Sequence, residues 1–118
     1  MAWALGVTVQ FELWYDSLTA GEQASIEYSL ALLGAGGPFL GRPHVDTVRA
    51  SRFPNMKELR TQHRGRPYRI LFAFDPARTA VLLIGDDKTG DKRWYDRTIP
   101  IADRLYEEHL ARLKENDR

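Results

Sequence analysis

The sequence predicts an α+β domain, in which a small antiparallel-rich sheet packs against two N-terminal helices and one C-terminal helix. Three observations point to this class. Residues 56–85 contain three closely spaced segments rich in aromatic and β-branched side chains; a capped segment with an apolar stripe precedes them, and an amphipathic segment follows. The expected order is β-α-α-β-β-β-α, in one domain spanning residues 1–118.

The first segment has features of both a strand and a helix. Apolar side chains alternate over residues 7–15, as in a strand, yet those over residues 11–18 recur at helical spacing. We interpret it as a strand near residues 3–8 that leads into a short helix from about Gln10.

A second helix is predicted from a start signal, a stripe and a stop signal. Thr19 and Glu22 have the spacing of a capping box, in which the hydroxyl and the carboxylate satisfy free amides at a helix start. The glycines and proline of residues 34–38 end the helix. Its apolar stripe consists of Ile26, Leu30 and Leu33.

The second half of the chain is predicted to be mostly strands. Residues 39–55, with two prolines, read as an irregular connection. Strands follow at Met56–His63, Tyr68–Phe74 and Thr79–Gly85, and the continuous apolar run of the third indicates burial on both faces. Residues 86–91 form a polar loop. A final helix runs from about Pro100 to Lys114, with an inward face made of Ala102, Leu105, Tyr106, His109, Leu110 and Leu113.

Composition excludes several classes of site. The chain has no cysteine, so disulfides, thiolate zinc sites and cysteine nucleophiles are excluded. Its three histidines lack the spacing of a metal motif, and we expect no metal or other cofactor. The N-terminus lacks a positively charged leader, and no run approaches the roughly 18 apolar residues of a membrane span. We therefore expect a soluble cytoplasmic protein.

Charge is distributed unevenly along the chain. The net charge is +1 overall, but it is −4 for residues 1–41, +6 for 42–69 and −1 for 70–118. A concentrated basic surface on a nearly neutral protein is typical of polyanion binding, most often of nucleic acid. A solvated arginine-rich loop is the alternative.

Four basic residues on or beside the predicted strands are candidates for chemistry: Lys57, Arg60, Arg69 and Lys88. Clustered cations could stabilise the charge that develops when an RNA 2′-hydroxyl attacks the adjacent phosphorus, and a lysine beside other cations could transfer a proton. Lys57 and Arg60 are three apart, so alternation places them on opposite faces of the sheet. As alternatives, both could be solvent-facing, Arg69 could pair with Glu58 or Asp75, and Lys88 could neutralise its loop.

Five further residues are candidates for RNA contact. Arg64 and Arg66 are expected to touch phosphates without selecting sequence, and Lys92 extends this set. Trp94 and Tyr95 could stack on bases or could equally be core residues.

Several strings in this sequence resemble the phage-derived HigB-like branch of the RelE/ParE toxin superfamily, and together they cover nearly the whole chain. They are Gly41–Asp46, Met56–Arg60, Gly65–Pro76, Val81–Gly90, Ile101–Asp103 and Tyr106–Leu110.

The resemblance implies the toxin of a type II toxin–antitoxin pair. RelE-like members cut messenger RNA in the ribosome without a metal ion, which would make this chain an endoribonuclease. It implies Arg69 as a phosphate clamp and Lys88 as a cation or proton-transfer group, with Arg60 and Lys57 as secondary candidates. It also implies a helix-turn-helix antitoxin that covers the basic face, with operator DNA bound only through that complex. Two alternatives stay open: a ParE-like inhibitor that binds DNA gyrase, and an inactive partner that only represses transcription.

Overall fold

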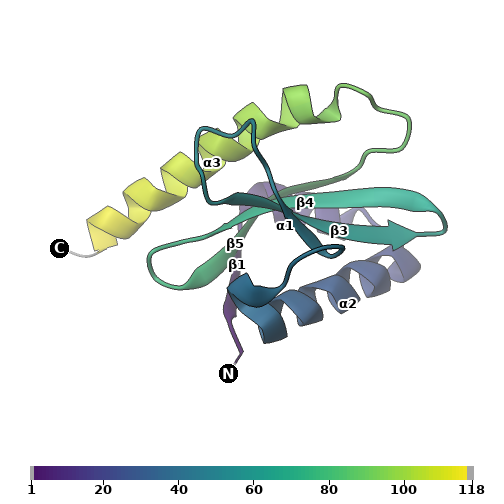
Figure 1. Cartoon of the computed structure of the whole chain (residues 1–118), viewed down its shortest axis with the longest axis horizontal. Helices are drawn as coiled ribbons and strands as arrows, with labels where there is room; N and C mark the ends of the chain where they lie inside the picture. The colour runs from purple at the N-terminus through teal and green to yellow at the C-terminus, as the bar shows by residue number, and fades with distance from the viewer. Residues whose placement is uncertain (1, 117–118) are drawn as a thin grey trace.

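The computed structural model describes residues 2–116 and contains strands, two N-terminal helices and a long C-terminal helix (Figure 1). None of the helices in this range is both long and apolar enough to cross a membrane. The elements are β1 (Ala4–Val7), α1 (Val9–Asp16), α2 (Ala20–Gly36), the 3₁₀ turn η1 (Gly37–Phe39), β2 (Val45–Thr47), β3 (Met56–His63), β4 (Arg66–Phe74), β5 (Thr79–Asp87) and α3 (Trp94–Asn116).

The strands form one mixed sheet in the order β1-β5-β4-β3-β2. β1 runs parallel to β5, and the other neighbours are antiparallel. β5 lies between two strands and is covered on both faces, so Ala80 through Leu83 are at most 2% exposed. This burial confirms the prediction made from the continuous apolar run.

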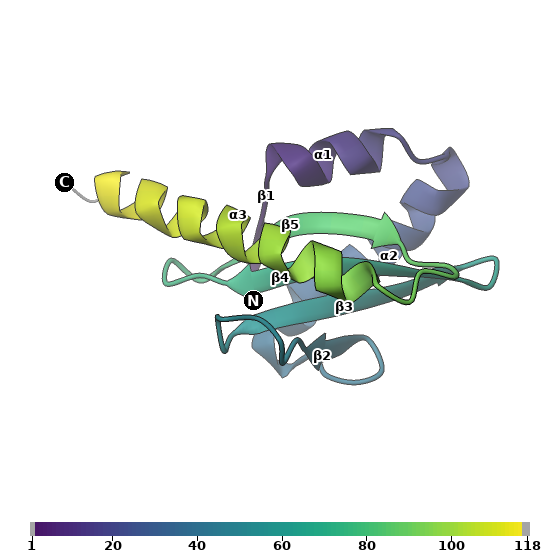
Figure 2. The same ribbon diagram turned by 90° about the horizontal axis from the view of Figure 1, so that it is seen from above.

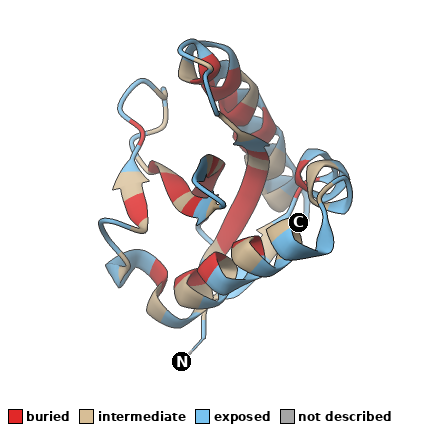
Figure 3. Ribbon diagram, turned by 90° about the vertical axis from the view of Figure 1, so that its right-hand side faces the viewer, coloured by how far each residue is buried: buried red, intermediate tan, exposed pale blue. Residues whose placement is uncertain are grey.

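The helices cover opposite faces of the sheet, which gives three layers (Figures 1 and 2). Side chains alternate across each strand, so the two faces bury different residues. One core, beneath α3, includes Met56, Leu71 and Trp94, and the other, against α1 and α2, includes Leu59 and Ile70. Figure 3 shows the buried residues concentrated on the sheet and on the helix faces turned toward it. The predicted α+β class and packing are therefore confirmed.

The start of α2 matches its sequence signal. Glu22 N–H donates to the Thr19 hydroxyl, and Thr19 N–H donates to the Glu22 carboxylate, which completes the predicted capping box. The Tyr68 hydroxyl also donates to this carboxylate. These hydrogen bonds lower the pKa of Glu22 to about 2, with the Tyr68 bond contributing most.

Two predictions about element boundaries were wrong. The connection 39–55 contains the short strand β2, which pairs with β3 at the edge of the sheet. The last helix begins at Trp94 rather than near Pro100. Proline is best tolerated at a helix start. Here the buried side chains of Trp94 and Ile99 pack the extra turns against the sheet, so the helix continues through the proline.

Candidate active site on the helix α3 face

Three strands place polar side chains in one row on the face of the sheet that α3 covers. Arg60 of β3 pairs in register with Arg69 of β4, and Arg69 pairs with Asp86 of β5. Directly paired residues of antiparallel strands point to the same face. The side chain of Arg69 is 14% exposed and that of Arg60 is 31% exposed. The sheet therefore brings two of the four predicted catalytic residues side by side.

A buried carboxylate holds these two arginines. Glu58 lies two residues before Arg60 and so shares its face. Its side chain is 7% exposed, and its Oε1 atom lies 3.1 Å from Arg69 Nε and 3.8 Å from Arg60 Nε. Of the two partners that the sequence offered for Arg69, the structure selects Glu58, because Asp75 instead contacts His109 at 2.7 Å. A carboxylate shared in this way offsets the repulsion between the two guanidinium groups. Arg60 also pairs with Asp46, at 3.1 Å.

Tyr95, in the first turn of α3, completes this cluster. Its hydroxyl donates a hydrogen bond of 2.7 Å to Glu58 Oε1. Burial raises the pKa of Tyr95, and the Glu58 carboxylate raises it further, whereas the nearby Arg69 guanidinium acts in the opposite direction. The phenol therefore stays protonated at neutral pH and can donate a proton or a hydrogen bond.

Lys88 lies beside the ring of the same tyrosine. Its ammonium nitrogen is 5.7 Å from the centre of the Tyr95 ring, within the range of a cation–π contact. No ion pair of Lys88 is found among residues 2–116. The neighbouring acids have other partners, since Asp86 accepts from the Trp94 indole and Asp87 pairs with Arg66 at 3.4 Å. Arg69 of β4 and Lys88, which follows the end of β5, thus both lie near Tyr95.

Two predicted residues do not belong to this cluster. Lys57 pairs in register with Phe72, whose side chain lies in the core on the α1–α2 side, so its own side chain leaves the opposite face from Arg60 and Arg69. The expected alternation is confirmed, and the grouping of Lys57 with the other three is corrected. Trp94, the first residue of α3, is fully buried in the core between this helix and the sheet, so it offers no face to a base.

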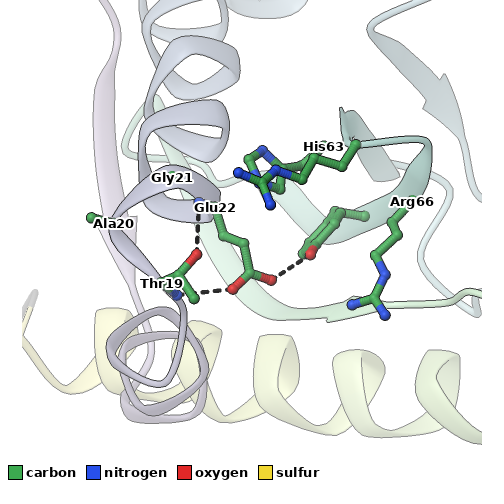
Figure 4. Close-up of a pocket in the computed structure, with 8 residues that line it drawn as sticks. Thr19, Ala20, Gly21, Glu22, His63 and Arg66 are labelled. Carbon is green, nitrogen blue, oxygen red and sulfur yellow. Dashed lines mark hydrogen bonds between the residues drawn. The ribbon is translucent and has the colours of Figure 1, made fainter.

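Arg64 and Arg66 line a separate pocket of about 540 Å³, on the α2 side of the sheet (Figure 4). The Arg64-Gly65 turn has positive φ at both positions, which suits a two-residue hairpin and carries Arg64 outward. Tyr68 lines the same pocket. Figure 4 shows His63 over the first turn of α2, where Gly21 leaves room for its ring. His63 Nδ1 lies 2.8 Å from the Ser25 hydroxyl. Lys92 is exposed in the loop before α3.

Sequence reasoning missed the central position of Glu58 and the contact that Tyr95 makes with it. The i,i+2 spacing of Glu58 and Arg60 was a usable signal, because such residues share a strand face. No pattern in the sequence predicted the contact between Tyr95 and Glu58, because that contact depends on where α3 begins and how it crosses the sheet.

Comparison with known proteins places this fold and site in a family. The model of the family described as phage-derived protein Gp49-like matches residues 13–107. A Mycobacterium tuberculosis protein described as a candidate toxin, HigB3, is 54% identical over 103 residues, covering 86% of this chain and 89% of the relative. HigB2 of the same organism, also described as a candidate toxin, is 45% identical over 104 residues, and the match spans 52% of its length.

Solved structures agree on the fold. The isolated Escherichia coli RelE toxin superimposes with a TM-score of 0.60 at 12% identity, covering 95% of this chain and 99% of RelE. RelE in the intact Escherichia coli RelBE toxin–antitoxin complex gives 0.56 at 10% identity, covering 73% and 96%. The architecture is thus that of the RelE-like toxins. The chain itself belongs to the phage-derived Gp49-like family, in its HigB-type branch, which confirms the resemblance inferred from sequence.

Proposed function

We propose that this protein is the toxin of a type II toxin–antitoxin pair and that it cleaves messenger RNA on the ribosome. Family membership, two relatives described as candidate HigB toxins and the RelE-like fold support the toxin assignment. The observation that carries the nuclease assignment is the cluster of Arg60, Arg69 and Tyr95 on the buried Glu58, with Lys88 beside Tyr95.

This cluster suits cleavage by an internal nucleophile. The RNA 2′-hydroxyl gives its proton to water and attacks the adjacent phosphorus, and the bond from phosphorus to the 5′-oxygen breaks. The 5′-oxygen takes a proton from the site, so the products are a 2′,3′-cyclic phosphate and a 5′-hydroxyl end. Negative charge gathers on the non-bridging oxygens, where Arg69 and Lys88 stabilise it. Glu58 and the Tyr68 carbonyl, which accepts from Arg69 Nη1 at 3.0 Å, hold Arg69 in place. Little reorganisation is therefore needed as the charge develops.

Two groups of the cluster can move protons. The protonated phenol of Tyr95 can donate to the leaving 5′-oxygen, because its raised pKa keeps the proton in place at neutral pH. The ammonium of Lys88 is the second donor within reach of the same ring.

The proposed partner is an antitoxin that covers the basic face, by analogy with the RelBE complexes of Escherichia coli and Mycobacterium tuberculosis. We propose that it carries a helix-turn-helix domain, so that operator DNA is bound only through the toxin–antitoxin complex. The proposed site of action is the cytoplasm, where messages are translated.

Transcript-end mapping after induction of the protein tests this function. We expect new 5′-hydroxyl ends within translated messages, and we expect them to disappear when translation is blocked beforehand. Intact transcripts together with accumulated DNA breaks would instead identify a gyrase inhibitor. Intact transcripts without DNA breaks would indicate a partner that only represses transcription.

A further inference from the structure

The outer edge of the sheet carries an aromatic side chain that neither the core nor the proposed catalytic cluster uses. Phe39, the last residue of η1, is 94% exposed. The turn that presents it is fixed, because Leu40 N–H donates to Gly37 O and Gly37 packs against the Trp3 ring. An exposed phenylalanine held by a fixed turn loses no packing when a ligand covers it.

Two cations flank this ring. Phe39, Arg42 and Lys57 line one concavity of about 260 Å³ beside β2. No ion pair of Lys57 is found in the described part of the chain. The Arg42 side chain is 74% exposed and pairs with Asp46 at 2.8 Å, a surface contact weak enough for a phosphate to compete with it. An aromatic face beside cations is the arrangement that binds single-stranded RNA, by base stacking and phosphate contact.

Asp46, which lines the concavity, connects it to the proposed catalytic cluster. Asp46 Oδ2 accepts from Arg42 on one side and from Arg60 on the other, at 2.8 Å and 3.1 Å. Arg60 in turn approaches Glu58, which holds Arg69. A chain of polar contacts therefore leads from the cluster to Arg42, which lines the same concavity as Phe39.

We propose that Phe39, Arg42 and Lys57 form a second RNA subsite, in which Phe39 stacks on a base and the two cations contact phosphates of a single strand that passes over the β2 edge. This inference rests on the proposed function and extends it to the strand outside the scissile linkage. It also gives Lys57 a role on the face where the structure places it.

Binding to an uncleavable probe tests the subsite separately from catalysis. The probe is a fluorescent 2′-O-methyl uridine oligonucleotide of about 12 nucleotides, a length matched to single-strand sites. Phe39→Ala is expected to weaken binding at least about fivefold, because a base–aromatic stack is lost, and Phe39→Trp to retain it. Lys57→Gln is expected to reduce the slope of log affinity against log salt by about 0.7. Leu13→Ala is the matched control, since Leu13 is 66% exposed on α1, away from the β2 edge.

Ribosomes carrying a message distinguish the source of the RNA. If Phe39→Ala binds both the oligonucleotide and the ribosomes more weakly, the subsite is assigned to the substrate strand. If it binds only the ribosomes more weakly, the subsite is assigned to ribosomal RNA. Unchanged affinity for both probes overturns the proposal and leaves the surface to a protein partner. Cleavage by Arg69→Ala is measured in parallel, so loss of the subsite and loss of the proposed nuclease function give different results.

Discussion

Tyr95 links the two halves of the candidate site at the scale of single residues. Its hydroxyl holds Glu58, which positions Arg60 and Arg69, and its ring lies beside the Lys88 ammonium. One side chain thus connects a strand-borne arginine pair to a lysine in a loop.

Tyr95→Phe separates these contacts, because it removes the hydroxyl and keeps the ring. The free energy of unfolding should fall by about 1 kcal/mol, the net value of one hydrogen bond, and more if the Glu58 carboxylate loses its fixed position. Cleavage should fall as well, since the phenol proton is lost. Chemical denaturation and a cleavage assay measure the two effects.

Tyr28→Phe is the control for this change. Tyr28 is 67% exposed, so the same chemical change there should leave both quantities unaltered. Full cleavage by folded Tyr95→Phe would show that the phenol has no part in proton transfer.

At this scale the sequence supported some of the assignments and not others. The i,i+3 spacing of Lys57 and Arg60 correctly placed them on opposite faces, because strand alternation is local. The sequence could not decide whether Trp94 is buried or stacks on a base, because its burial depends on where α3 begins, and packing against the sheet determines that start. The roles proposed for Arg69 and Lys88 stay predictions, although the structure places both near Tyr95.

At the scale of elements, close packing determines how α1 lies on the sheet. Gly85 of β5 faces the Trp14 ring of α1, and a Cβ atom added there would overlap that ring. The glycine therefore lets α1 lie directly on the strand.

Gly85→Ala should force α1 away from β5 and destabilise the fold by about 1–3 kcal/mol, the usual cost of overpacking. Thermal denaturation measures the loss. Gly41→Ala is the matched control, because a Cβ atom at Gly41 meets nothing within 4 Å. The free energy of unfolding of this variant should be close to that of the parent. Equal stability of the two variants would show that Trp14 moves aside without cost.

The capped start of α2 makes stability depend on pH. The pKa of Glu22 falls from 4.5 to about 2 on folding, so the ionised form stabilises the native state above pH 4.5. That contribution is lost as the pH falls from about 4.5 to about 2. Glu22→Gln should therefore be less stable than the parent at pH 7, and the difference should shrink across this window. A difference that stays constant with pH would assign the effect to packing rather than to charge.

Elements were predictable from sequence where the signal was local. The capping box and the buried run of β5 each lie within a few residues, and both were predicted. β2 has only three residues and no alternating pattern, and it forms because β3 offers an open edge. The early start of α3 likewise reflects contacts with the sheet that no local pattern contains.

Charge is separated across the whole molecule. The acidic first third forms β1, α1 and α2, whereas the basic block of residues 42–69 forms β2, β3 and the start of β4. Figure 2 shows α1 and β2 at opposite sides of the sheet. A polyanion would therefore meet the β2–β3 side first.

Binding to ribosomes should weaken steeply as salt rises, because each phosphate neutralised by a lysine or arginine releases counterions. Sedimentation at several salt concentrations measures this dependence. A flat profile would exclude the basic block as the RNA-binding surface. The basic block was evident from the sequence. The register of the strands was needed to divide its residues among three surfaces: the catalytic face, the pocket at Arg64 and Arg66, and the β2 edge.

The most direct test is the cleavage rate of purified protein on ribosomes that carry a defined message. Arg69→Ala and Lys88→Ala, each shown to be folded by circular dichroism, should lose at least about a hundredfold in rate, because each removes a cation from the charged transition state. Arg112→Ala, on the exposed surface of α3, should cleave like the parent. Parental rates in both site variants would contradict the assignment of catalysis to the α3 face.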